Sequence, residues 1–61
     1  MHNEYAAVIY DPMNIVTRVE ERPTRERADK AGKFYTKRAG WWYLIVSDWH
    51  DIELYKALIN A

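Results

Sequence analysis

Cysteine is absent from the chain, and this absence excludes disulfides, thiolate metal sites and cysteine nucleophiles. Long apolar runs are also missing, because the longest one, residues 41–46, is far shorter than the ~18 residues of a membrane span. The first residues show no basic stretch followed by an apolar one, so no secretion signal is expected. The sequence therefore predicts a cytoplasmic protein without contact to a membrane.

Residues that commonly build active sites are scarce. Ser47 is the only serine, and Gly32 and Gly40 are the only glycines, so neither a serine triad nor a glycine-rich phosphate loop can be assigned. The acidic segment 48–53 contains one histidine and lacks the paired histidines of zinc proteases. We expect no catalytic residues, no cofactor and no metal site.

The length of 61 residues limits the chain to a single domain, residues 1–61. A domain of this size buries only about 60% of the surface that its unfolded chain exposes. Small domains often add disulfides, a metal or a second subunit to compensate for a thin core. We therefore expect marginal stability for an isolated subunit.

Three segments have the pattern of β-strands. Residues 5–10 are apolar and rich in strand formers, which is typical of a strand buried on both faces. Residues 15–20 alternate between apolar and polar side chains, which predicts an edge strand protected by charge. Residues 41–46 form the most apolar strand, and residues 11–14 have a common length for a hairpin loop.

Two helices complete the predicted order ββαβα. The first is expected over residues 25–38, with Thr24 as N-cap and Gly40 as a left-handed C-cap residue, while Gly32 indicates close packing on the sheet. The second begins after a cap at Ser47 or Asp48. Its apolar stripe is expected to contain Ile52, Tyr55, Leu58 and Ile59.

The connections between these elements predict the topology. A right-handed crossover through the first helix makes the third strand parallel to the second. Placing the first strand between them, antiparallel to both, gives the strand order 2-1-3. We expect an α+β domain with a three-stranded mixed sheet, one face of which is covered by both helices.

The aromatic content exceeds what such a sheet can enclose. Nine aromatic side chains are present, and each one buries roughly 150–250 Å² when enclosed. Alternation in the third strand places Trp41, Tyr43 and Ile45 on the face opposite Trp42. The surplus favours an exposed patch that anchors a protein partner or a second subunit, with Trp41 and Tyr43 as anchors. Alternatively, the rings only supplement a small core.

Basic residues are concentrated in one part of a neutral chain. Residues 18–38 hold eight bases and four acids, a net charge of +4, while the remainder holds one base and five acids, a net charge of −4. This separation makes the protein dipolar if the basic segment lies on one side. The basic helix places cations around an aromatic ring, and its candidate partner-binding residues are Arg27, Lys30, Lys33, Phe34, Lys37 and Arg38.

Two functions fit these features, besides the alternative that the helix is an ordinary solvated surface held by Glu26–Lys30 and Asp29–Lys33 pairs. The first is a small protein-binding module that acts as an inhibitor, adaptor or modulator of a larger protein, with a homodimer formed through the sheet. A phage or mobile-element origin fits such a short, cysteine-free chain, but this is an association with chain type and not a physical argument. The second is a nucleic-acid-binding regulator that uses the basic helix, although no known nucleic-acid motif accompanies it.

Overall fold

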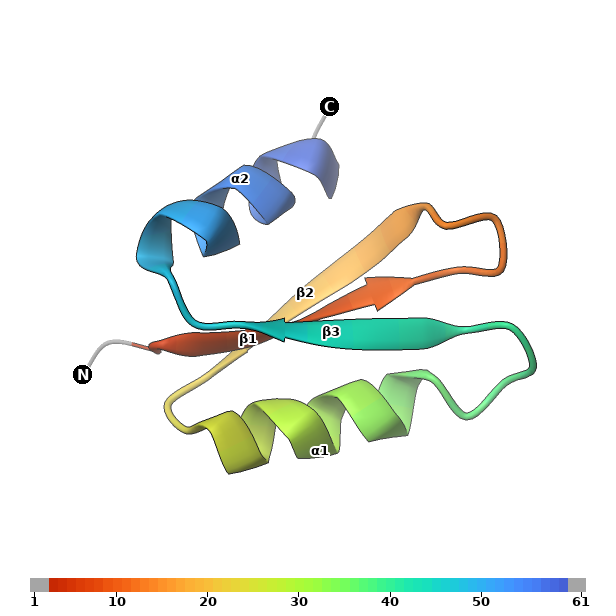
Figure 1. Cartoon of the computed structure of the whole chain (residues 1–61), viewed down its shortest axis with the longest axis horizontal. Helices are drawn as coiled ribbons and strands as arrows, with labels where there is room; N and C mark the ends of the chain where they lie inside the picture. Colours follow the sequence, from red (N-terminus) through yellow and green to blue (C-terminus); the bar gives the residue numbers. More distant parts are fainter. Residues whose placement is uncertain (1–2, 60–61) are drawn as a thin grey trace.

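One three-stranded sheet lies between two helices (Figure 1). The computed structural model of the chain describes residues 3–59. The predicted order ββαβα and the α+β class are confirmed. The elements are β1 (Tyr5–Tyr10), β2 (Val16–Arg22), α1 (Arg25–Tyr35), β3 (Trp42–Val46) and α2 (Trp49–Ile59).

The strand order β2-β1-β3 is also confirmed. Val8 at the centre of β1 lies opposite Val19 of β2 and Leu44 of β3, and both pairings are antiparallel. The outer strands run in the same direction, as the crossover predicts, but they are not neighbours. Every hydrogen-bonded pair is therefore antiparallel, and the sheet is antiparallel instead of mixed as expected. Both outer strands therefore have one edge without a strand partner among residues 3–59.

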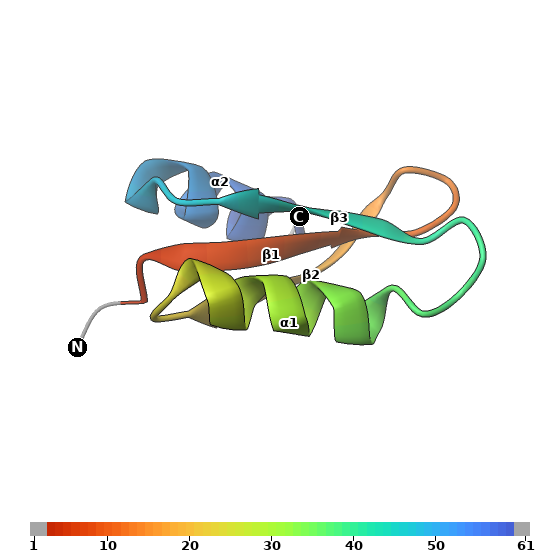
Figure 2. The ribbon, with the colours of Figure 1, turned by 60° about the horizontal axis from the view of Figure 1, so that its bottom comes forward.

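The two helices lie on opposite faces of the sheet, so the expectation that both cover one face is wrong (Figures 1 and 2). α1 lies on one face, where the backbone at Gly32 packs against the ring of Tyr43. α2 reaches the other face, where Lys56 Nζ lies 3.1 Å from a carboxylate oxygen of Glu21. Because Tyr43 and Glu21 point to opposite sides of the sheet, the arrangement has three layers.

The reason for this arrangement lies in β1. Ala6 and Val8 point to the α2 face, Ala7 and Ile9 point to the α1 face, and all four are almost completely buried. A helix on one face alone would have left two of these side chains in water. The buried double-sided strand predicted from the sequence is confirmed, and it requires a cover on each side.

Few side chains complete the core around β1. Ala28 and Ala31 of α1 and Ile52 of α2 are buried, and small residues let α1 approach the sheet closely. Leu58 and Ile59, which we expected in the apolar stripe of α2, are 60% and 39% exposed. Each described helix has 11 residues, and neither combines the length and the apolar character needed to cross a membrane.

Side-chain caps begin both helices where the sequence predicts them. The hydroxyl of Thr24 accepts a hydrogen bond of 3.2 Å from the backbone N–H of Arg27. The carboxylate of Asp48 accepts one of 2.7 Å from the backbone N–H of His50. Such caps satisfy N–H groups that have no partner within the helix.

The end of α1 differs from the prediction. The helix stops at Tyr35 instead of residue 38, and the Thr36 hydroxyl donates a hydrogen bond of 2.7 Å to the carbonyl of Gly32. Gly40 has the expected left-handed backbone, with φ of 84°, but it serves the turn that leads into β3. In this turn the N–H of Trp41 donates to the carbonyl of Arg38 at 3.2 Å. β2 also extends two residues beyond the predicted limit, to Arg22.

Replacing Gly32 by alanine is expected to destabilise the protein. A Cβ at this position would overlap the ring of Tyr43, lying 2.6 Å from its Cγ. Overpacking of this kind costs about 1–3 kcal/mol, which outweighs the ~1 kcal/mol gain in helix propensity. Urea denaturation measures the difference, with Lys30→Ala on the exposed side of α1 as control. A Gly32→Ala protein as stable as the unaltered chain would show that α1 does not depend on this close approach.

Candidate functional site

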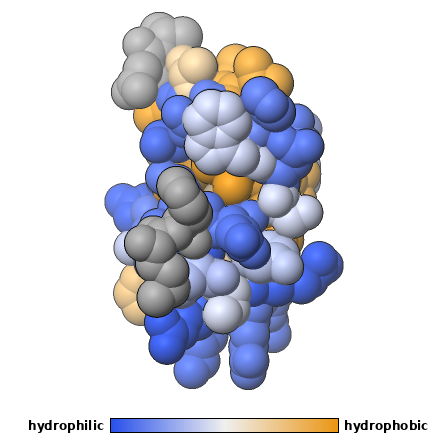
Figure 3. Space-filling view, turned by 90° about the vertical axis from the view of Figure 1, so that its left-hand side faces the viewer, coloured by the Kyte–Doolittle hydropathy of each residue, from blue (hydrophilic) through white to orange (hydrophobic). Residues whose placement is uncertain are grey.

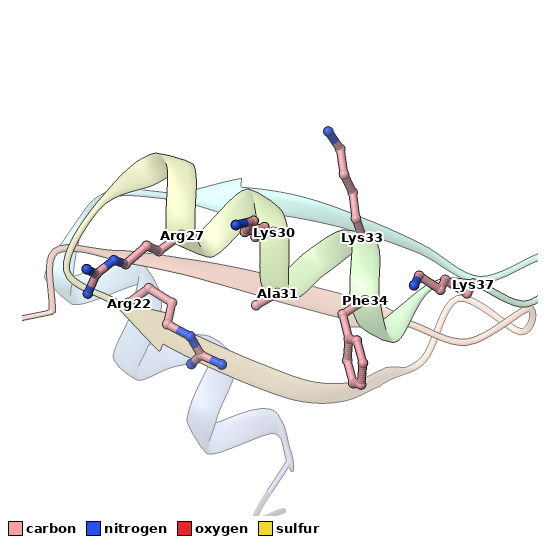
Figure 4. A pocket seen from close by; sticks show the side chains of 7 residues that line it. All are labelled: Arg22, Arg27, Lys30, Ala31, Lys33, Phe34 and Lys37. Carbon is pink, nitrogen blue, oxygen red and sulfur yellow. The ribbon is translucent and has the colours of Figure 1, made fainter.

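A concave surface of about 650 Å³ lies beside α1 (Figure 4). In this view Phe34 points toward β2, whereas Lys33 points away from that strand. We call this surface the basic hollow, and its lining residues are Arg22, Arg27, Lys30, Ala31, Lys33, Phe34 and Lys37. Five of the eight residues predicted to bind a partner therefore meet at one place.

Arg22 belongs to the basic hollow but was not among the predicted residues. The sequence pattern ended the second strand at residue 20, so Arg22 was counted only in the charge balance. In the structure β2 continues to Arg22 and places it on the α1 side of the sheet, opposite Tyr5. Continuing the alternation of Arg18 and Glu20 by one more step would have found it.

Phe34 is the apolar centre of the basic hollow. Its side chain is 63% exposed, so most of the ring is accessible to a ligand. The Nζ of Lys37 lies 5.7 Å from the ring centroid, within the range of a cation–π contact. Tyr35 packs its ring edge-on against Phe34 at a centroid distance of 4.9 Å, which restricts the orientation of both rings.

Most cations of the basic hollow have no ion pair with this chain. Lys33 lies 3.1 Å from Asp29, which confirms one of the two expected helix pairs, and Arg22 lies 3.1 Å from Glu20. The expected Glu26–Lys30 pair is not among the ion pairs of residues 3–59. Among the ion pairs of residues 3–59, none involves Arg27, Lys30 or Lys37. These three charges are thus open to a ligand.

A second, smaller hollow of about 330 Å³ lies on the same side of the sheet, and we call it the stacked hollow. The guanidinium of Arg18 lies 4.1 Å from the ring centroid of Tyr35, and that of Arg38 lies 4.2 Å from the ring centroid of Trp41. The contact between Phe34 and Tyr35 joins the two hollows. The lining residues of the stacked hollow are Ile9, Thr17, Arg18, Tyr35, Arg38 and Trp41.

Tyr43, predicted as an exposed anchor, lies beneath α1. Its ring packs on Gly32, and its hydroxyl donates a hydrogen bond of 2.6 Å to Asp29 Oδ1. On this face α1 covers Tyr43, whereas Trp41 lines the stacked hollow. Tyr43 therefore fastens α1 to the sheet.

Aromatic rings remain accessible all over the molecule, as the sequence predicts. None of the nine aromatic side chains is buried. Trp49 is 62% exposed at the start of α2. Trp42 is 41% exposed although its ring stacks on Tyr10 at 4.1 Å, and its Nε1–H donates to Asn14 Oδ1 at 3.0 Å. The interior is too small for these rings, so each contributes to the surface.

Charge is divided between the two outer layers. All eight bases of residues 18–38 lie on the α1 side, since alternation directs Arg18 and Arg22 toward α1 and the others follow in α1 or in the turn after it. α2 begins instead with acidic residues, Asp48, Asp51 and Glu53. Figure 3 shows hydrophilic side chains over most of the lower, α1 side, whereas the upper side carries hydrophobic surface at the top among further hydrophilic side chains. The predicted dipolar surface is present.

The hydrogen bond between Tyr43 and Asp29 shifts the pKa of both groups. It lowers the pKa of Asp29 below 3.8, and Lys33 lowers it further. The same bond, together with burial, raises the pKa of Tyr43 above 10.0. The hydrogen bond therefore stabilises the fold fully at pH values between the ordinary pKa of Asp29, 3.8, and that of Tyr43, 10.0. It is lost as the pH falls through the lowered pKa of Asp29 or rises through the raised pKa of Tyr43.

Replacing Tyr43 by phenylalanine is expected to raise the pKa of Asp29 toward its ordinary value, because the carboxylate loses its strongest donor. Carboxyl titration by NMR measures this shift, and the part of the stability that is lost on acidification should become smaller, because the native and unfolded pKa values of Asp29 then differ less. Tyr35→Phe is the matched control, since its hydroxyl has no bond to Asp29. An unchanged titration of Asp29 in Tyr43→Phe would contradict the assigned contact.

Comparisons with known proteins do not identify a relative. No protein-family model matches the chain, and neither the curated proteins nor the solved structures contain a match.

Proposed function

We propose that this protein is a protein-binding module that docks an acidic surface of a larger protein through the basic hollow. The observation that carries the proposal is the exposed ring of Phe34 beside Arg27, Lys30 and Lys37, which form no ion pair within residues 3–59. The module then serves as an inhibitor, an adaptor or a modulator of the larger protein, depending on which surface of that protein it covers.

The composition of the basic hollow supports a protein partner. Aromatic and arginine side chains dominate the binding energy of protein interfaces, and they act best when an accessible ring enters a pocket of the partner. Phe34 supplies the ring, and Arg27 supplies a planar group that can hold a carboxylate with two hydrogen bonds. Lys30 and Lys37 add charge around this centre.

The site is also held in place before a partner arrives. Thr24 caps the start of α1, and the Tyr43 contacts hold its middle on the sheet. A ligand therefore does not have to order this helix, which lowers the entropic cost of binding. The positive α1 side additionally steers an acidic partner toward the hollow, so association should slow as salt increases.

Phe34→Ala is expected to abolish capture of the partner, because loss of a central hot-spot ring costs about 2 kcal/mol or more, roughly thirtyfold in affinity. The chain is immobilised, and proteins retained from nuclease-treated lysate are identified by mass spectrometry. Trp49→Ala is the matched control, since this ring is equally exposed but lies at the start of α2. A purified captured protein should bind Lys30→Glu more weakly and should bind the unaltered chain less well at high salt. Equal capture by Phe34→Ala and Trp49→Ala would contradict the proposal.

Single-stranded nucleic acid is the second candidate ligand, and the stacked hollow is the observation that favours it. Cationic groups for phosphates and aromatic faces for bases are the two components of such sites. Here Arg18 and Arg38 already stack on Tyr35 and Trp41, and the basic hollow adjoins them. An extended single strand of nucleic acid would then lie along α1 and contact both the stacked hollow and the basic hollow.

This second function predicts a steep dependence on salt. The anisotropy of a labelled single-stranded oligonucleotide should rise with protein at low salt, and the slope of log affinity against log salt should be about −0.7 per phosphate contact. Simultaneous charge reversal at Lys30, Lys33 and Lys37 should remove the binding, whereas Trp49→Ala should leave it unchanged. Absence of binding to single strands and duplexes at tens of micromolar protein excludes this function and leaves the protein-binding proposal intact.

A further inference from the structure

The outer edge of β3 is free of a strand partner in the described part of the chain. β3 pairs with β1 alone, and in an antiparallel pair alternate residues direct their N–H and C=O groups away from the neighbour. The strand reads Trp-Tyr-Leu-Ile-Val, without charge, proline or glycine. Isolated subunits normally protect such an edge with charge or proline. The opposite edge, β2, has that protection, since four of its seven residues are charged.

Apolar side chains continue from this edge across the α2 face. Trp42, Leu44 and Val46 point to this face, where α2 lies over β2 and β1. Trp42 is 41% exposed, and the other two are half-buried. The strip thus combines unpaired backbone groups with apolar surface that no described element covers completely.

Charges of opposite sign stand at the two ends of β3. Lys37 and Arg38 precede it in the turn after α1, and Asp48 and Asp51 follow it at the start of α2. Two antiparallel copies of β3 would bring the basic end of each copy to the acidic end of the other. A parallel arrangement would place like charges together. The edge is therefore complementary to itself in the antiparallel direction only.

We propose that a second copy of this chain pairs with the outer edge of β3, antiparallel and centred near Leu44, so that two sheets join into one of six strands. Trp42 of each copy then lies across from Val46 of the other, and Leu44 lies across from Leu44. Five strand residues span only ~17 Å, so the interface is smaller than that of permanent dimers. The dimer accordingly forms and dissociates with concentration, and the basic hollow remains open in it.

Sedimentation equilibrium of charge-swapped variants tests this pairing. The mass of the unaltered chain should rise from 7.3 kDa toward twice that value as concentration increases from micromolar to millimolar. Leu44→Lys and Leu44→Glu each place like charges opposite one another, and each should weaken the dimer about tenfold or more. An equimolar mixture of the two should restore it, because lysine then faces glutamate.

Leu54→Lys is the matched control, since Leu54 is an exposed leucine of α2 away from the edge and its replacement should not alter the dimer. Phe34→Ala should also dimerise normally, so failure of the docking proposal and failure of this one are distinguishable. A chain that stays at 7.3 kDa at millimolar concentration, or folded variants that do not associate on mixing, would overturn the pairing.

A measurement on the unaltered chain keeps the test valid if the Leu44 variants do not fold. Hydrogen exchange of the β3 amides is followed by NMR at low and high protein concentration. Alternate β3 amides should become more protected as concentration rises, while those of the β2 edge should not change. Protection of β3 that is independent of concentration would equally refute the dimer.

Discussion

Burial of β1 on both faces is the constraint from which the rest of the structure follows. Four consecutive small or branched apolar residues are removed from water there, and each face needs its own cover. α1 and α2 supply these covers, so the chain forms three layers although it is very short. The consequence is that the interior is thin everywhere, and the larger side chains lie at the surface of each layer.

The thin interior explains why α1 can serve as a rigid docking element. Small residues, Ala28, Ala31 and Gly32, bring the helix close to the sheet, and Tyr43 fastens it by ring packing and by the bond to Asp29. These contacts occupy the inner side of α1 alone. Phe34, which points toward β2 from the flank of α1, and the cations around it are left accessible for binding.

The two surfaces that we propose for binding differ in physical character. The basic hollow offers charge and one ring, which suits a ligand that brings negative charge and an apolar pocket. The β3 edge offers backbone groups and apolar side chains, which suits another strand. They belong to different parts of the fold, so a protein that is assembled through β3 still presents its basic hollow, and a dimer would present two.

The sequence by itself determined the α+β class, the five elements, the cap at Thr24 and the separation of charge, because periodicity, capping and charge are local properties. It predicted the order 2-1-3 from the handedness of the crossover, and it left the second cap open between Ser47 and Asp48. It also predicted most residues of the basic hollow, since positions along one helix follow from its period. Only the tertiary structure decided that the helices take opposite faces, that Tyr43 lies under α1 and that Arg22 joins the hollow. Those outcomes depend on which helix packs on which face of β1. The spacing of apolar residues along the sequence is the same for either placement, so it cannot distinguish them.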